Sequence, residues 1–69
     1  MTNQLVSIGD VWEHHSGHTY IVVAVANTTA EKSEYVPTVC YRSMLTNEVY
    51  ARPMEEFLVK MKLIERGNV

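Results

Sequence analysis

The sequence predicts a mostly β domain, a small five-stranded barrel with one short helix between strands four and five. Three observations predict it. The chain has 69 residues, enough for one small core. Short stretches rich in β-branched and aromatic residues alternate with turn residues. A stretch near the C-terminus instead has the apolar spacing of a helix. We expect one domain over residues 1–69, with the barrel core at 9–66 and an N-terminal segment at 1–8.

The composition excludes several classes of protein. At 46% apolar and 20% charged residues, the chain is too apolar to be a disordered tail. Six basic and eight acidic residues give a net charge of −2, which argues against a partner held by phosphate charge alone. One cysteine cannot form an internal disulfide. The longest apolar run, Tyr20–Ala26, is too short for a membrane helix. Residues 1–6 show no signal peptide, so we expect a cytoplasmic protein with no membrane partner.

The first predicted hairpin joins a strand at residues 11–14 to a strand at 19–27. Gly9 and Asp10 form the turn that precedes it. Gly17 suits the third place of a three-residue loop, because that place favours a left-handed backbone. The second strand is apolar on both faces, which predicts a central position in the sheet or a strongly curved barrel.

The register of this hairpin pairs Trp12 with Tyr20 and His14 with His18. It places Trp12, Tyr20 and Val22 on the same face of the sheet. We therefore expect these three side chains to form part of the core.

The second predicted hairpin follows a polar surface loop at residues 28–36. Its strands are residues 38–43 and 48–52. A three-residue turn at 45–47, with Asn47 left-handed, joins them. This register predicts a core face formed by Val39, Tyr41, Val49 and Ala51. It predicts a solvent face formed by Cys40, Arg42, Tyr50 and Arg52.

A short helix is predicted to begin at Pro53, which suits the first helical position. One helical stripe then carries four apolar residues: Met54, Phe57, Leu58 and Met61. We expect the stripe to close one end of the barrel, and a partner-binding helix face is the alternative. A last strand at residues 63–65 completes the element order of SH3-like barrels, closer to the Tudor or KOW variety than to a signalling SH3 domain.

The candidate binding residues are Arg42, Tyr50 and Arg52, together with His14 at the tip of the first hairpin. Two guanidinium groups beside an aromatic ring can hold a phosphate, a carboxylate or a stacked base. The alternative is that both arginines pair with surface acids and cover Tyr50.

Two further candidates concern metal binding and catalysis. His14, His15 and His18 lie within five positions, but zinc needs three or four ligands and neighbouring strand residues point to opposite faces. Cys40 with a nearby histidine is a candidate nucleophile, although free cysteine usually packs as a small apolar group. We expect no cofactor, no metal and no catalytic residue.

The motifs of the chain resemble a short bacterial and bacteriophage family, the domain of unknown function numbered 1653. The segments that carry the resemblance are Gly9–His14, Gly17–Val22, Ala26-Asn27, Tyr35–Arg42 and Val49–Phe57. The Arg-Pro pair after an aromatic strand is the most specific part, and the Tyr-x-Pro-Thr-Val form of the third strand is most similar to phage and prophage members. Ser16 replaces a common Lys, and Cys40 a common Val. The resemblance implies a small cytoplasmic β-barrel, and it brings no activity or catalytic residue.

We therefore expect a non-catalytic binding module that is phage- or prophage-encoded and recognises a host protein or a small anionic ligand. A nucleic-acid-binding barrel is the first alternative. An enzyme or metal protein that uses the histidines and Cys40 is the second. A homodimer through exposed strand edges stays open.

Overall fold

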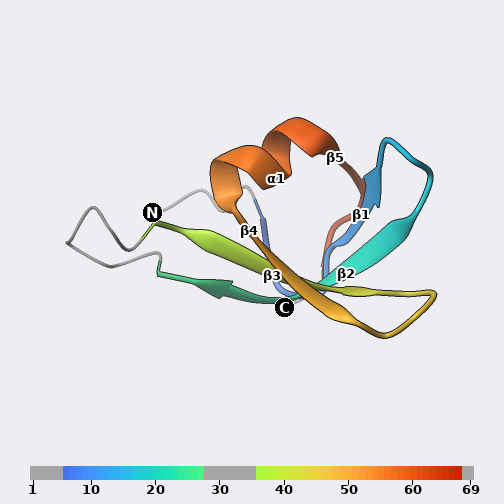
Figure 1. Cartoon of the computed structure of the whole chain (residues 1–69), viewed down its shortest axis with the longest axis horizontal. Helices are drawn as coiled ribbons and strands as arrows, with labels where there is room; N and C mark the ends of the chain where they lie inside the picture. The colour runs from blue at the N-terminus through green and yellow to red at the C-terminus, as the bar shows by residue number, and fades with distance from the viewer. Residues whose placement is uncertain (1–5, 28–35, 68–69) are drawn as a thin grey trace.

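The computed structural model describes residues 6–27 and 36–67, which form one antiparallel five-stranded sheet and one helix (Figure 1). The elements are β1 (Val11–His14), β2 (Thr19–Ala26), β3 (Thr38–Ser43), β4 (Val49–Pro53), α1 (Met54–Lys60) and β5 (Met61–Glu65). This order confirms a mostly β chain with a short helix between the fourth and fifth strands. Residues 28–35 of the predicted surface loop lie outside the described residues.

The sheet is open, whereas the sequence predicted a closed barrel. The strand order is β4-β3-β2-β1-β5, so that β4 and β5 are edge strands. Between them runs α1, which contacts β3, β4 and β5 and lies over one face of the sheet (Figure 1). The helix joins these two strands directly, with no residue between the elements.

The first hairpin has the predicted register. Trp12 pairs with Tyr20, and the His14 N–H donates to the carbonyl of His18 at 2.8 Å. Gly17 has a φ of 98°, the left-handed conformation that the loop requires. Strand β2 is central, with β1 on one side and β3 on the other.

The turn of the second hairpin is one residue longer than predicted. Asn47 is left-handed as expected, with a φ of 67°. The Ser43 N–H, however, bonds the Glu48 carbonyl at 2.8 Å, which leaves four residues in the loop. The buried Ser43 hydroxyl accepts the N–H groups of Leu45 and Thr46, both at 3.1 Å. This side-chain turn lengthens the loop and shifts the register of β4 by one residue.

The register shift makes the predicted faces of this hairpin wrong. Tyr41 pairs with Tyr50 and Arg42 pairs with Val49. Residues that oppose each other across a ladder share a face, and faces alternate along a strand. Tyr50 and Arg52 therefore lie on the face of Tyr41, whereas Arg42 lies on the opposite face. The three residues predicted to form one surface are divided between the two sides of the sheet.

The core lies between α1 and the sheet. Its buried apolar residues are Val6, Trp12, Val22, Val39, Tyr41, Phe57 and Met61. The helical stripe is thus part of the core, as predicted. Met61 differs in one respect: it is the extended first residue of β5, with a φ of −121°, and not a helical residue. Pro53 is the N-cap of α1 rather than its first residue. Val6, which the sequence placed before the core, is 2% exposed.

Asp10 joins the two ends of the described chain. Its carboxylate is fully buried and accepts the N–H of Ser7 at 2.8 Å and the indole N–H of Trp12 at 3.3 Å. From the C-terminal end, Arg66 donates to it at 2.8 Å, and so does the N–H of Gly67. A Cβ atom at Gly67 would collide with the backbone of the Gly9-Asp10 turn, which explains a glycine there.

Candidate functional site

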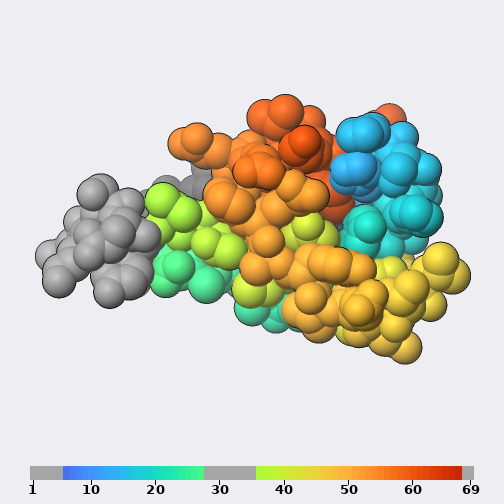
Figure 2. Space-filling view, in the orientation of Figure 1, coloured from blue at the N-terminus to red at the C-terminus, as the bar shows by residue number. Residues whose placement is uncertain are grey.

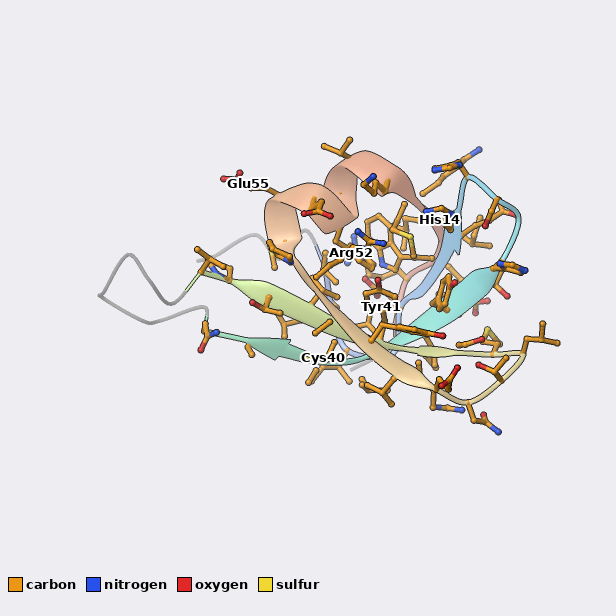
Figure 3. The ribbon with its side chains drawn as sticks, viewed as in Figure 1. His14, Cys40, Tyr41, Arg52 and Glu55 are labelled. Atoms are coloured by element: carbon orange, nitrogen blue, oxygen red, sulfur yellow. The ribbon has the colours of Figure 1, made fainter. Side chains whose placement is uncertain are left out.

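One hollow, of about 230 Å³, is built by side chains from all five strands. We call it the tyrosine hollow, and its lining residues are His14, Ser16, Tyr20, Tyr41, Tyr50, Arg52 and Met61. Figure 3 shows three of them, His14, Tyr41 and Arg52, on the side of the sheet that faces α1. The hollow brings together three of the four predicted binding residues: His14, Tyr50 and Arg52.

Three aromatic rings form the walls of the tyrosine hollow. The rings of Tyr20 and Tyr41 are perpendicular, with centroids 5.2 Å apart, and those of Tyr20 and Tyr50 are perpendicular at 6.1 Å. Tyr41 and Tyr50 are tilted by 31° at 5.9 Å. Tyr41 is buried, whereas Tyr50 is 42% exposed. The hollow therefore offers both ring faces and ring edges to a planar group.

Arg52 is the permanent positive charge of this hollow. Its Nε donates to the Tyr41 hydroxyl at 2.9 Å and its Nη1 donates to Glu56 at 2.6 Å. The hydrogen bond to Tyr41, with a smaller contribution from Glu56, raises the pKa of Arg52. Arg52 is thus oriented by Tyr41 on one side and by Glu56 on the other. The Tyr50 hydroxyl donates to Glu48 at 3.1 Å, which raises the pKa of Tyr50.

His14 lies at the rim, and its hydrogen bonds favour the neutral ring. The Ser16 N–H donates to His14 Nδ1 at 3.1 Å, so the proton of the neutral imidazole belongs on Nε2. Partial burial, followed by the positive charges of His15, Arg52, Lys60 and His18, lowers the pKa of His14.

We expect the pKa of His14, measured by NMR titration of its ring protons, to lie below the ordinary value of 6.5. The unfolded chain binds this proton at the ordinary pKa. Because the folded chain binds the proton less tightly than the unfolded chain does, the protein is most stable while His14 is neutral in both states, above pH about 6.5. Its stability decreases as the pH falls below that value. In Arg52→Gln the midpoint should rise toward 6.5, because one repelling charge is gone. A His14 midpoint above 6.5 in the wild type would contradict this assignment.

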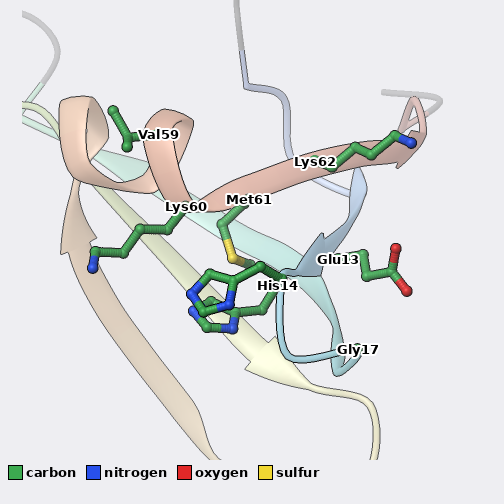
Figure 4. Close-up of a pocket in the computed structure, with 8 residues that line it drawn as sticks. Glu13, His14, Gly17, Val59, Lys60, Met61 and Lys62 are labelled. Carbon is green, nitrogen blue, oxygen red and sulfur yellow. The ribbon is translucent and has the colours of Figure 1, made fainter.

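A second hollow, of about 340 Å³, adjoins the first, because His14 and Met61 line both. We call it the basic hollow. Its charged or titratable residues are Glu13, His14, His15, Lys60 and Lys62. Figure 4 shows the side chains of His14 and Lys60 on one side of β1 and those of Glu13 and Lys62 on the other.

Arg42 and Cys40 lie outside both hollows. Arg42 donates to the Asn47 side chain at 2.8 Å, at the hairpin tip. Cys40 pairs with Ala24 and Ala51, so that it shares the face of Arg42. Figure 3 shows Cys40 on the far side of the sheet from His14. The cysteine–histidine pair considered as a nucleophile is therefore not assembled.

Within the described ranges, no three His, Cys, Asp or Glu side chains are grouped as a metal site requires. The histidine rings nonetheless make contact: those of His14 and His15 lie 4.0 Å apart. The Ser16 hydroxyl lies 2.9 Å from His14 Nδ1 and 3.4 Å from His18 Nδ1. The imidazoles are held by each other and by this hydroxyl. In residues 6–27 and 36–67, no helix has the length and apolar content to cross a membrane.

Sequence reasoning missed two of the three tyrosines as binding residues. The sequence predicts both Tyr20 and Tyr41 as core residues; Tyr41 belongs to the buried core, and Tyr20 packs against it. Each ring also lines the tyrosine hollow. The signal that could have found them is the turn at Ser43, whose hydroxyl sets the register that places Tyr50 opposite Tyr41.

Figure 2 shows the tips of both hairpins, residues 14–19 in blue to cyan and 43–49 in yellow, at the same end of the molecule.

Comparison with known proteins yields a family match. The model described as "Protein of unknown function (DUF1653)" matches residues 10–66. Neither a curated protein nor a solved structure matches the chain. The matched range contains every residue of both hollows.

Proposed function

The chain belongs to the DUF1653 family of proteins of unknown function, and from this premise we propose that it is a non-catalytic binding module that recognises a small anionic ligand through the tyrosine hollow. A host protein that presents such an anionic group is an equivalent partner. We further propose that the fold is an SH3-like barrel of the Tudor or KOW type. In this barrel the edge strands β4 and β5 do not pair, and α1 covers the gap between them. We assign the protein to a phage or prophage, because of its Tyr-x-Pro-Thr-Val segment, and to the cytoplasm of the bacterial host.

The observation that carries this proposal is the convergence of three tyrosine rings with Arg52. The rings come from three different strands, β2, β3 and β4, so only the folded sheet brings them together. Tyrosine and arginine are enriched where proteins bind partners, since their rings and guanidinium groups offer large contact area at small entropic cost. The exposed Tyr50 is accessible to a ligand.

An anionic group is the ligand chemistry that suits Arg52. The side chain of its present partner, Glu56, is 49% exposed. Ion pairs that are this exposed contribute little to stability. A ligand carboxylate or phosphate can therefore replace Glu56 as the acceptor at Nη1, while the Tyr41 hydroxyl keeps Nε in place. A planar group attached to the anion would lie against Tyr50.

We expect benzoate, which has one planar ring and one carboxylate, to shift the amide NMR signals of Tyr50 and Arg52. Arg52→Gln should weaken this binding about 5- to 20-fold, since a charge-assisted hydrogen bond is lost. Arg42→Gln is the matched control, because it removes the same charge from the opposite face, and it should bind benzoate as the wild type does.

The same two variants test for a natural ligand or partner in a bacterial lysate. Molecules that co-purify with the wild type and with Arg42→Gln, but not with Arg52→Gln, would be recognised through the hollow. Equal benzoate affinity in Arg52→Gln and Arg42→Gln would disprove the proposed site.

A further inference from the structure

The two hollows adjoin each other at His14 and Met61, which form part of both linings. One side of this boundary is aromatic, with Tyr20, Tyr41 and Tyr50. The other side is basic. A single ligand that extends across His14 would therefore meet ring faces at one end and positive charge at the other.

The basic hydrogen-bond donors collect on one side of β1. Lys60, at the end of α1, extends on the same side as the His14 imidazole (Figure 4). The His15 ring lies against that of His14, with centroids 4.0 Å apart. Arg52 completes the group from β4. This concentration of donors occurs in a chain whose net charge is −2, so it is a local feature and not a consequence of a basic composition.

Glu13, the acidic residue of the basic hollow, does not pair with the imidazoles or Lys60, whereas Arg52 is paired with Glu56. Glu13 pairs across the ladder with Lys62, whereas His14 pairs with Met61. Side chains alternate between faces along a strand, so Glu13 and Lys62 share the face away from the His14 imidazole. Figure 4 shows this division. The imidazole–lysine side of the hollow is thus open to an anion.

We propose that the ligand of these two adjoining hollows is a nucleotide unit, with its base against the tyrosine rings and its phosphate between His14, His15 and Lys60. This inference rests on the proposed function, because it names the ligand class of the same site. A phosphate has three acceptor oxygens, and two imidazole N–H groups and an ammonium are three donors. A base offers a π-face to the tyrosines, and base–tyrosine stacking adds affinity that phosphate charge alone does not supply.

The size of the site supports a ligand with two separated groups. The hollows measure about 230 and 340 Å³, and they meet at the rim residue His14. In a nucleotide the sugar separates the base from the phosphate, so each group can enter its own hollow. Phenyl phosphate lacks this spacer and can fill only one hollow at a time.

The test is an NMR titration of the full-length chain with four probes: AMP, adenosine, inorganic phosphate and phenyl phosphate. We expect AMP to bind about tenfold more tightly than any of the other three, because only AMP makes both the stacking and the phosphate contacts. AMP should shift the amide signals of Tyr50 and of His15 together. Inorganic phosphate should shift the signal of His15 but leave that of Tyr50 unchanged, because it has no planar group to lie against the ring.

Lys60→Gln and Arg42→Gln provide a matched pair of variants. Lys60→Gln removes a positive charge from the imidazole side of the hollow, and Arg42→Gln removes a positive charge that lies on the opposite face of the sheet. We expect Lys60→Gln to weaken AMP and phosphate about threefold or more and to leave adenosine unchanged. Arg42→Gln should leave the affinity for all four probes within about twofold of wild type.

Several outcomes would overturn the nucleotide assignment. If AMP binds no more tightly than phosphate, the base makes no contact with the tyrosine rings. If phenyl phosphate binds as tightly as AMP, the site does not require a spacer between the ring and the phosphate. Benzoate binding that depends on Arg52, without AMP binding, would leave the proposed function standing and refute only the nucleotide. If neither benzoate nor AMP binds, both proposals fail. Tighter binding of a single-stranded oligonucleotide than of AMP would support the nucleotide unit and identify a nucleic-acid strand as its source.

Discussion

Replacement of Asp10 by alanine is expected to destabilise the fold by about 3–5 kcal/mol, because the N–H groups of Ser7, Trp12 and Gly67 lose a buried, charged acceptor. The Asp10 carboxylate accepts hydrogen bonds from both ends of the described chain, from Ser7 and Trp12 on one side and from Arg66 and Gly67 on the other. A chain of this length has a total stability of only about 3–10 kcal/mol. Much of the Asp10→Ala protein should therefore be unfolded at 25 °C. Urea denaturation, followed by circular dichroism and Trp12 fluorescence, measures the change.

Two variants show whether the loss comes from the buried carboxylate. Glu65→Ala removes an exposed carboxylate from β5 and should change the unfolding free energy by no more than about 0.5 kcal/mol. Asp10→Asn keeps the shape and part of the acceptor capacity, so its loss should be intermediate. Wild-type stability in Asp10→Ala would show that Asp10 does not connect the two chain ends in solution.

Phe57→Ala is expected to cost about 3–5 kcal/mol, the usual loss when a buried phenylalanine side chain is removed. The Phe57 side chain is fully buried, and its ring contacts those of Trp12 and Tyr41 at centroid distances of 5.0 and 5.2 Å. It is the buried residue of α1, and Met54 and Leu58 of the same helix pack against the core beside it. The midpoint of thermal unfolding should fall by about 10 °C or more.

Val59→Ala is the control on the same helix. Val59 is 84% exposed, and its truncation should change stability by no more than about 0.5 kcal/mol. Tyr41 contacts Phe57 and also lines the tyrosine hollow. Any Phe57→Ala protein that remains folded should therefore bind benzoate more weakly, whereas Val59→Ala should bind it normally. Equal stability of the two variants would show that α1 does not pack on the sheet.

The local elements of this fold were predictable because each depends on neighbouring residues. The bounds of β1 and β3 agree with the sequence prediction. Gly17 and Asn47 have the left-handed backbone that their turns require. The apolar spacing from Met54 to Leu58 places Phe57 in the core.

The candidate site was predictable only in part. His14, Tyr50 and Arg52 were identified by residue type, since aromatic and basic side chains at strand positions are typical of binding surfaces. Arg42 was grouped with them through the register of a three-residue turn. The Ser43 hydroxyl bonds two backbone N–H groups of the loop, and this competing turn adds the residue that places Arg42 on the other face.

The sequence by itself determined the kind of protein: a small, mostly β domain whose strands, turns and short helix follow from the residues within each segment. Only the tertiary structure decided which side chains meet. A change of one residue in a loop turns every side chain of the following strand to the other face. The fold also joins positions that are distant in sequence, as in the ion pair between the buried Asp10 and Arg66. Both the tyrosine hollow and this ion pair depend on such long-range pairing, which no local pattern specifies.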